Sequence, residues 1–475
     1  MAKKYHSYSD IKSGLQSGDV TVEQLVKQYL QQINTNTHLN VFNEVFGDEA
    51  LAQAKALDVR LKNNEPVGKL AGMVIGIKDN ICYKDHKVTA SSKILENFTS
   101  IYSATIVERL LAEDAIIIGR CNCDEFAMGA SNENSYFGPV KNFADETRVG
   151  GGSSGGSAVA VQAGMCHAAI GTDTGGSVRQ PASFCGVIGL KPTYGRISRH
   201  GIISYASSFD QVGPITQSVE DAALLLEVMA GPDEYDATLA NQPVSTAHEL
   251  KPDAHQKRIA YLQEALTSPG VDADVKGTLS TYIDKLRADG HIVKPISFEL
   301  LDYLVPTYYI LAMAEASSNL ARYDGVHYGY RSPNATDLVS TYKKSRSEGF
   351  GKEVKRRIML GTFVLSAGYY DAYYAKAQKV RRLIQDKTNE ILNDFDFILT
   401  PTAPEPAFAL GLKEKDPVVT YLYDIFTVQA SLAGLPAISL PAGNNGKGLP
   451  LGLQLLTKKF GETELLNFSE YFLKL

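Results

Sequence analysis

The chain contains 475 residues, of which 44% are hydrophobic and 21% are charged, and its formal net charge is −6. This composition is typical of a globular protein, and the acidic balance argues against general binding of polyanions. The N-terminal sequence lacks the apolar core of a signal peptide, and no apolar run reaches the roughly 20 residues that a membrane-spanning helix needs.

The five cysteines form an odd and sparse set for so long a chain, which is typical of the reducing cytoplasm. Only one residue separates Cys121 from Cys123, and no second pair completes a zinc site. We therefore predict a cytoplasmic protein with packed thiols and no bound metal.

The first part of the chain, residues 1–65, is predicted to be a helical layer. One helix runs from about Val20 to Ile33, where a polar cap precedes an apolar-periodic segment, and another covers 48–62. An apolar run over 71–77 has the length of a buried strand and leads directly into Lys78.

Helix and strand patterns then alternate to about Met229, starting with a helix over 104–113 and a strand over 115–119. This alternation favours an α/β sheet. A polar stretch that begins with Asp124 and Glu125 follows the second of these strands. These two carboxylates lie either in a solvated turn or along a functional site.

Two glycine-rich loops are the most informative feature of the chain. One surrounds Ser153 in GGGSSGGS and the other ends at Ser177 in DTGGS, with a helical pattern over 157–165 and a strand pattern over 167–172 between them. Glycine lets other atoms approach the backbone, so N–H groups can converge on the oxyanion of an acyl-transfer intermediate. The candidate donors are the N–H groups of Thr174, Gly175, Gly176 and Ser177.

Two other interpretations of these loops fit less well. A flexible linker, which glycine-serine runs often form, is not expected between apolar helix and strand patterns. The serine of GGSSG also satisfies the G-x-S-x-G pattern of α/β-hydrolases, but residues 145–149 are polar where that pattern needs a hydrophobic strand. The later histidines stand in no comparably marked loop, and His167 is predicted to be a core residue.

The sequences GGSSGGSA and GTDTGGSVRQPA together resemble the amidase signature family. The resemblance implies a Ser–Ser–Lys triad, with Ser177 as the acyl-forming nucleophile, Ser153 as the bridging serine and Lys78, in its GIKDN context, as the base. The position of Lys78 agrees with this role, because a lysine at the end of a buried strand loses hydration and its neutral form is favoured.

The resemblance also implies the fold: an α/β domain with a central mixed β-sheet covered by helices on both faces. A single domain is expected, divided into the helical layer 1–65, a catalytic core 66–230, a peripheral and largely helical part 240–395 with substrate-facing residues, and a return to the core over 396–475.

Two departures from the family pattern precede the first glycine loop. Gly150 stands where the family usually has proline, and Phe143 stands where Asn142 is usually followed by proline. Neither change touches the expected triad. Asp210, in a segment with a close family counterpart, is expected to brace the glycine loops.

The later half of the chain carries fewer local signals. Residues 240–289 are polar, and we predict peripheral helices and strands there, with the weakest candidate domain boundary. Between Lys343 and Lys387 there are twelve Lys or Arg against four Asp or Glu. Such an excess is usually a solvated helical face, and a surface facing a polyanion is the alternative.

Further sequences narrow the resemblance to one branch of the family. EASSNLARYDGVHYG, RRIMLGTFVLSAGYYDAYY, TPTAPEPA and LAGLPAISLPAG are similar to the A subunits of aspartyl/glutamyl-tRNA amidotransferases. This implies a glutaminase that supplies ammonia for the amidation of misacylated Glu-tRNA(Gln), with Asp-tRNA(Asn) as an open second substrate. It also implies a heterotrimer with a B subunit, which uses ATP and Mg²⁺ and holds the tRNA, and a small C subunit.

A free glutamine needs an anion to bind its ammonium and a planar cation, best an arginine, to bind its carboxylate. Matching the family's substrate positions gives Tyr308, Arg357 and Asp424 in this chain. Tyr309 and Arg356 leave one-residue alternatives open, and Asp424 could instead be a surface turn residue.

The chain has no P-loop, because neither Gly68-Lys69 nor Gly351-Lys352 stands in the G-x(4)-G-K-[ST] frame. We therefore expect this chain to bind no cofactor and the B subunit to supply the ATP dependence. Two other functions stay open. One is a free-standing amidase acting on another amide, which needs no amino-acid clamp. The other is a catalytically silent scaffold that binds tRNA or partner chains.

Overall fold

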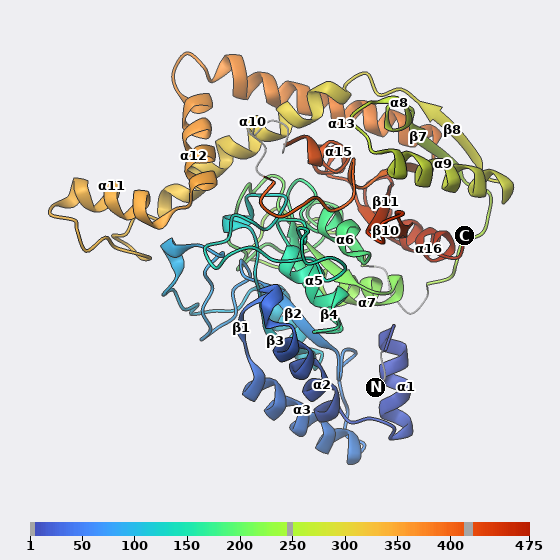
Figure 1. Cartoon of the computed structure of the whole chain (residues 1–475), viewed down its shortest axis with the longest axis horizontal. Coiled ribbons are helices and arrows are strands. Elements are labelled where there is room, and N and C mark those ends of the chain that lie inside the picture. Colours follow the sequence, from blue (N-terminus) through green and yellow to red (C-terminus); the bar gives the residue numbers. More distant parts are fainter. Residues whose placement is uncertain (1–4, 245–249, 413–420) are drawn as a thin grey trace.

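The computed structural model describes residues 5–244, 250–412 and 421–475. The strands are β1 (Phe42–Val45), β2 (Val74–Lys78), β3 (Ile116–Cys121), β4 (Ala168–Asp173), β5 (Ile188–Lys191), β6 (Gln211–Thr216), β7 (Arg258–Leu262), β8 (Ile292–Ile296), β9 (Phe397–Pro401), β10 (Ala437–Asn444) and β11 (Pro450–Leu456). They form one 11-stranded sheet in the order β1-β3-β2-β4-β6-β5-β10-β11-β9-β7-β8 (Figure 1).

The sheet is mixed. β2 runs parallel to both β3 and β4, and β7 runs parallel to β8 and β9. The other neighbouring strands are antiparallel. The parallel pairing matters for the site, because the carboxyl ends of β2 and β4 then lie side by side at the same end of the strands.

The α-helices of the described residues surround this sheet. They are α1 (Tyr8–Ser17), α2 (Val22–Thr35), α3 (Gly47–Lys62), α4 (Thr105–Ala112), α5 (Gly155–Gln162), α6 (Arg179–Cys185), α7 (Val219–Met229), α8 (Glu264–Thr267), α9 (Ala273–Ala288), α10 (Leu301–Asn319), α11 (Leu338–Gly349), α12 (Lys352–Leu365), α13 (Lys376–Asp394), α15 (Val428–Ala433) and α16 (Glu462–Phe472). None of them combines the length and apolarity that a membrane crossing needs.

The helices cover both faces of the sheet because its buried strands are apolar on both sides. Successive strand side chains point to opposite faces. Ile116 and Ile118 therefore pack in one core with α2, α3, α5 and α6, whereas Ile117 packs in the other with α4, α7 and α16. A continuous apolar run is the pattern expected of strands buried in this way, so the predicted fold class is confirmed.

Most of the elements expected in the first half of the chain are present. The helices predicted from Val20 and over 48–62 are α2 and α3, and Lys78 is the last residue of β2. The strand predicted from Ala71 begins only at Val74, because Gly72 adopts a positive φ of 87° in the preceding turn.

The sheet draws strands from all four predicted parts of the chain. The N-terminal layer is not wholly helical, since β1 pairs with β3 at one edge of the sheet. The polar segment 240–289 contributes β7, which pairs with β9 on one side. On its other side β7 pairs with β8, the last strand at the opposite edge of the sheet. β1 and β7 are only four and five residues long, so their sequence signal is weak, and their partners β3 and β9 are distant in the chain.

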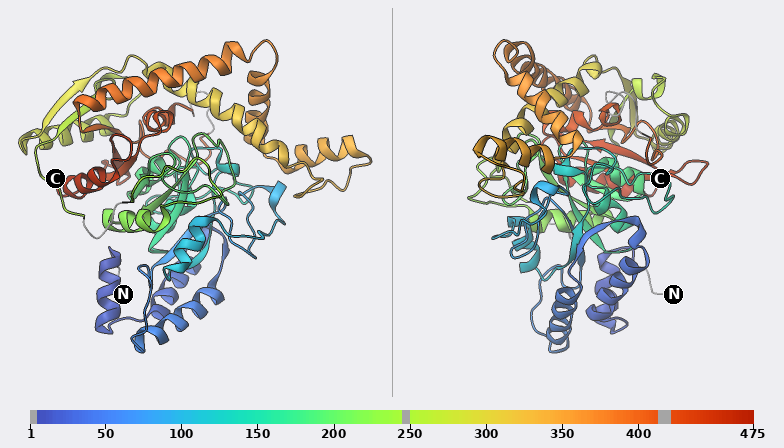
Figure 2. Two further views of the ribbon diagram at one scale, coloured as in Figure 1. Left: turned by 180° about the vertical axis from the view of Figure 1, so that it is seen from behind. Right: turned by 60° about the vertical axis from the view of Figure 1, so that its left-hand side comes forward.

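Four helices from the later half lie together beyond the sheet. α10 packs against α12 and α13, and α13 packs against α15. α11 extends away from the body of the molecule, as Figure 1 and the left view of Figure 2 show. α10, α12 and the short η7 turn (Leu422–Asp424) carry the residues predicted to bind substrate.

Candidate active site

Lys78 lies fully buried at the end of β2. Its Nζ donates to Ser153 Oγ at 2.7 Å, to Ser154 Oγ at 2.9 Å and to Thr172 Oγ1 at 3.0 Å. Ile77 pairs with Ile170 across the parallel β2–β4 ladder, so Thr172 reaches the same edge as Lys78. The strand register thus brings the lysine to both loop and strand hydroxyls.

Burial makes Lys78 a usable base. It lowers the pKa of the ammonium group from 10.5 to about 8, although the carboxylates of Asp124, Asp173 and Asp210 act in the opposite direction. A base with a pKa close to neutral pH holds a substantial neutral fraction and can still accept a proton effectively.

Ser153 lies in a tightly constrained loop. The Gly152–Ser153 peptide bond is cis, and the Ser153 carbonyl accepts the N–H of Asp124 at 3.1 Å. Gln180 bridges this loop to a neighbouring one: its Oε1 accepts the N–H of Gly152, and its Nε2 donates to the Ala130 carbonyl, both at 3.0 Å. A Cβ at position 152 would collide with Asp124, so glycine is required there.

Ser177 lies on the second loop and is 8% exposed. The two loops are joined directly, because the Ser154 N–H donates to the Ser177 carbonyl at 3.1 Å. Among the described residues, no hydrogen bond joins Ser153 Oγ to Ser177 Oγ. The structure thus joins Lys78 to Ser153 and the two serine loops to each other, but not the two serine hydroxyls. Catalytic hydrogen bonds are often looser in a structure without substrate.

A buried ion pair holds the loop of Ser177. Asp173 and Arg179 are both fully buried, and two guanidinium nitrogens approach the carboxylate at 2.9 Å each. Arg179 also donates to the Thr427 carbonyl and to Gln454 Oε1. Although burial opposes it, the neighbouring Arg179 keeps the pKa of Asp173 below its ordinary value.

Replacing Arg179 with methionine is expected to destabilise the protein by about 3 kcal/mol or more, because Asp173 would be left buried without a counter-charge. Urea unfolding followed by circular dichroism measures the effect. Arg382→Met is the control, since the Arg382–Asp386 pair is largely exposed and should contribute less than about 1 kcal/mol. Equal destabilisation by both variants would contradict this role of the ion pair.

The predicted oxyanion donors differ in availability. No acceptor among the described residues takes the N–H groups of Thr174, Gly175 or Ser177, whereas the N–H of Gly176 donates to Asp173 Oδ1 at 2.9 Å. Gly176 could therefore serve an oxyanion only as a shared donor. Thr174, Gly175 and Ser177 stay proposed donors.

Asp210 braces the second glycine loop, as expected. Its Oδ1 accepts the Thr174 hydroxyl at 2.7 Å, and the carboxylate also accepts the N–H groups of Tyr205 and Ala206. Burial raises the pKa of Asp210 to about 6.

Two of the three residues predicted to bind substrate, Tyr308 and Asp424, are linked to the second glycine loop, and Arg357 packs among tyrosines next to them. Tyr308 is buried against Gly175, where a Cβ would collide with its ring. Arg357 is 4% exposed and lies over the rings of Tyr205, Tyr309 and Tyr421. Because Thr427 donates both to the Gly175 carbonyl and to the Asp424 carbonyl, Asp424 is tied to the same loop.

The one-residue alternatives occupy different places. Arg357 is buried and donates to Tyr205 and Glu353, whereas the side chain of Arg356 is 34% exposed and pairs with Glu353. Tyr309 donates to Asp424 Oδ2 at 2.7 Å. Asp424 is buried rather than in a surface turn, and burial raises its pKa to about 7. An ammonium ion bound beside it would favour the charged carboxylate.

Asp124 and Glu125 are both buried, which excludes the solvated turn. Asp124 accepts the N–H groups of Asn132 and Asn134, and burial raises its pKa to about 6. Burial raises the pKa of Glu125 to about 7. Buried carboxylates with such shifts are typical of functional sites.

The basic excess over 343–387 is partly internal. Arg346 donates to two carbonyls near the end of α10, Arg357 is in the site, and Arg381 donates to Ser208 and to the Leu432 carbonyl. These arginines are not available to a polyanion, whereas Lys343, Lys352 and Arg382 are exposed. For the exposed residues, the solvated face and the surface facing a polyanion both stay predictions.

No histidine of the described residues takes part in this site. His167 is buried and pairs with Asp221 at 2.9 Å, as expected of a core residue. No described histidine is hydrogen-bonded to Ser153 or Ser177, and no cluster of His, Cys, Asp and Glu that could hold a metal lies among the described residues.

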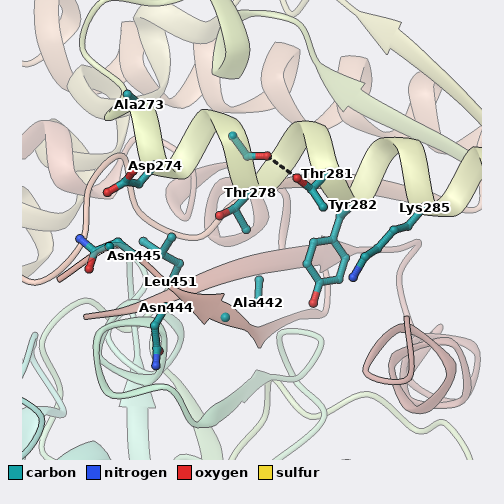
Figure 3. Close-up of a pocket in the computed structure, with 13 residues that line it drawn as sticks. Ala273, Asp274, Thr278, Thr281, Tyr282, Lys285, Ala442, Asn444, Asn445 and Leu451 are labelled. Atoms are coloured by element: carbon teal, nitrogen blue, oxygen red, sulfur yellow. Dashed lines mark hydrogen bonds between the residues drawn. The ribbon is translucent and has the colours of Figure 1, made fainter. Parts of the chain in front are cut away.

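A separate groove of about 470 Å³ lies between α9 and the turn that joins β10 to β11 (Figure 3). Asp274, Thr278, Tyr282 and Lys285 line it from α9, and Asn444 at the end of β10 and Asn445 in the turn line it from the other side. Its described lining contains none of the predicted site residues.

The sequence analysis missed several residues of the site. Ser154 and Thr172 both bind Lys78, and Gln180 and Arg179 fix the two loops. Ser154 and Thr172 had a usable signal, because they lie inside the two glycine motifs. Phe143 and Gly150, which depart from the family pattern, make no hydrogen bond to the triad.

The comparisons with known proteins agree on one family. The family model described as Amidase matches residues 24–466. The A subunit of glutamyl-tRNA(Gln) amidotransferase from Chlorobium phaeobacteroides is 51% identical over 98% of both chains. The protein of the same name from Chlorobaculum tepidum is also 51% identical, again over 98% of both chains.

A solved structure shows the same similarity in three dimensions. The crystal structure of the A subunit of glutamyl-tRNA(Gln) amidotransferase from Thermotoga maritima matches with a TM-score of 0.79 and 41% identity. The match covers 95% of this chain and 91% of that one.

Proposed function

The chain belongs to the amidase family, and on that premise we propose that it is the glutaminase subunit, the A subunit, of a tRNA-dependent amidotransferase. It hydrolyses glutamine through an acyl-enzyme on Ser177 and supplies ammonia for the conversion of Glu-tRNA(Gln) to Gln-tRNA(Gln). The observation that carries this proposal is the buried Lys78–Ser153 contact. Arg357 and Asp424, also buried, both contact Tyr309, because Arg357 lies over its ring and Asp424 accepts its hydroxyl.

The proposed chemistry moves one proton along the three residues. Neutral Lys78 Nζ takes the proton of Ser153 Oγ, and Ser153 Oγ takes that of Ser177 Oγ as Ser177 attacks the side-chain amide carbon of glutamine. The N–H groups of Thr174 and Gly175 stabilise the oxyanion that forms. The proton returns along the same path to the leaving nitrogen, ammonia departs, and water then hydrolyses the γ-glutamyl ester on Ser177.

We assign specificity for glutamine to Arg357, Asp424 and Tyr308. The Arg357 guanidinium is suited to bind the substrate carboxylate, and Asp424 is suited to bind its ammonium. Tyr308 packs on Gly175 and closes the site beside the reacting amide. A free-standing amidase for an apolar amide would have no need of a guanidinium and a carboxylate at its substrate, since burial of charged groups is costly.

Partners and cofactors follow from the same proposal. We propose that a B subunit binds the tRNA and uses ATP and Mg²⁺, and that a C subunit completes a heterotrimer. The names of the relatives support the tRNA-dependent reaction. Glu-tRNA(Gln) is the proposed substrate of the complex, with Asp-tRNA(Asn) as the second one to assay. The cytoplasm is the proposed location, since the chain's five cysteines are all free thiols.

Glutamine hydrolysis by the purified chain, alone and with B and C subunits, tests this function. Weak hydrolysis that rises with the partners and charged tRNA supports it. Turnover of an unrelated amide without any glutamine hydrolysis would identify a free-standing amidase instead. No amide hydrolysis with any partner would favour a scaffold.

Replacing Arg357 with methionine is expected to raise the KM for glutamine by about 100-fold, because a charge-assisted bidentate contact is worth roughly 1.5–3 kcal/mol. Steady-state kinetics measure this change. Arg356→Met is the matched control and should leave KM within about twofold, since Arg356 is half-exposed. The reverse pattern would move the carboxylate-binding role to Arg356.

A further inference from the structure

Glu125 joins two distant segments of the chain. It lies in the short turn η3 (Glu125–Ala127) after β3 and is 2% exposed. Its two carboxylate oxygens accept the N–H of Gly351 at 3.0 and 2.9 Å, and the Ser92 hydroxyl also donates to it. Gly351 is the residue immediately before α12.

The contact supplies a cap that α12 lacks in its own sequence. The first N–H groups of a helix have no partner within it, and a negative charge there is stabilised by the helix dipole. Glu125, from 226 positions away, accepts the N–H of the N-cap residue Gly351, the bond that a Glu at the third helical position makes in a capping box. A Cβ at position 351 would collide with Glu125 Oε2.

Phe126 reinforces the same junction. Its ring lies 5.6 Å from that of Phe350 and 5.0 Å from that of Tyr323, measured between centroids. The start of α12 is therefore held by packing as well as by hydrogen bonds.

The anchored helix carries Arg357, which binds Glu353 one turn earlier and lies over three tyrosine rings. On the other side of Glu125, the N–H of Asp124 donates to the Ser153 carbonyl. Two consecutive residues thus contact the loop of the bridging serine and the helix of the substrate-binding arginine.

From this geometry we infer that Glu125 is a positioning residue for glutamine binding: it fixes the start of α12 so that Arg357 faces the substrate carboxylate. The inference rests on the proposed function. A misplacement of about 1 Å at a substrate-positioning group can cost up to 100-fold in rate, so loss of the anchor has measurable consequences.

The test compares two substrates. Glutamine depends on Arg357, whereas a small p-nitrophenyl ester without α-carboxylate or α-ammonium acylates Ser177 and makes no use of Arg357. Glu125→Ala is expected to raise the KM for glutamine about tenfold, a change of about 1.4 kcal/mol. The kcat for glutamine and the rate of ester acylation should both stay within about twofold. Glu125→Gln, which keeps an acceptor oxygen for the Gly351 N–H, should restore most of the affinity.

Asp58→Ala is the matched control. Asp58 accepts the N–H groups of Val22 and Glu23 at 2.7 and 2.9 Å, so it also caps a helix, α2, from a distant element. It lies in the N-terminal layer, and its loss should lower stability without changing the KM for glutamine. Gly351→Ala is a second route to the same displacement of Glu125, should Glu125→Ala fold poorly.

Two results would overturn the inference. In the first, Glu125→Ala or Gly351→Ala leaves the KM for glutamine unchanged. In the second, glutamine hydrolysis and ester acylation fall together, which would indicate general damage to the loop of Ser153. If the wild-type chain with its partners acylates with the ester but never hydrolyses glutamine, the proposed function fails as well, and this outcome is seen before any variant is compared.

Discussion

Ser177→Ala is expected to lower the rate of glutamine hydrolysis by about 10⁴-fold or more. Removal of a catalytic nucleophile costs on this order, because only binding and oxyanion stabilisation are left. Release of ammonia, measured with the partner proteins present, reports the loss. Substrate binding should persist, since Arg357 and Asp424 do not depend on the Ser177 hydroxyl.

Ser157→Ala is the control for this substitution. Ser157 is a buried serine on α5 whose hydroxyl donates to the Ile170 carbonyl at 3.3 Å, so it belongs to the structure around the loops. Its loss should change stability by about 1 kcal/mol and leave catalysis nearly intact. Retention of glutamine hydrolysis in Ser177→Ala would favour the scaffold interpretation or a different nucleophile.

Lys78→Met is expected to lower acylation of Ser177 by about 10³-fold or more, because general-base catalysis contributes roughly 10²–10⁴-fold and Ser153 loses its proton acceptor. The wild-type pH profile carries the same information. A base must be neutral to accept a proton, and an amine is neutral above its pKa. With the pKa of Lys78 lowered to about 8, kcat/KM should rise about tenfold per pH unit below pH 8 and level off above it.

Lys191→Met is the matched control for the loss of a buried lysine. Burial lowers the pKa of Lys191 to about 7, but its Nζ donates to the Pro192 carbonyl and to neither serine. The variant should keep the wild-type pH profile. A profile that flattens in Lys191→Met and persists in Lys78→Met would reverse the assignment. The pH profile measured with the ester substrate separates the titration of Lys78 from that of Asp424, because the ester carries no ammonium group for Asp424 to bind.

Short-range patterns explain what could be predicted from the sequence. The apolar runs that form β2 and β4 are local features. Lys78 is the last residue of β2 and the loop of Ser177 follows β4, whereas the loop of Ser153 leads into α5. Because both strands are parallel to each other, their carboxyl ends meet. The contact between Lys78 and Ser153 is therefore a consequence of elements that are visible in the chain.

The parts that could not be predicted depend on distant pairs. Arg179 binds Gln454 across 275 positions, and Glu125 binds Gly351 across 226. The sequence near one partner does not indicate the other. The residues around Glu125 also do not show whether its carboxylate is buried or lies in a solvated turn. The hydrogen bond from the Gly176 N–H to Asp173 is a similar case, because it depends on the geometry of the turn that follows β4.

The most direct test of the account is the site of acylation by glutamine. The wild-type chain, mixed with its partner proteins and glutamine, is quenched in acid within the first turnovers, and its peptides are analysed by mass spectrometry. The account predicts a γ-glutamyl adduct on Ser177 that is absent in Ser177→Ala and strongly reduced in Lys78→Met. Glutamine hydrolysis with an adduct on Ser153, or with no adduct on Ser177 in the wild type, would contradict it.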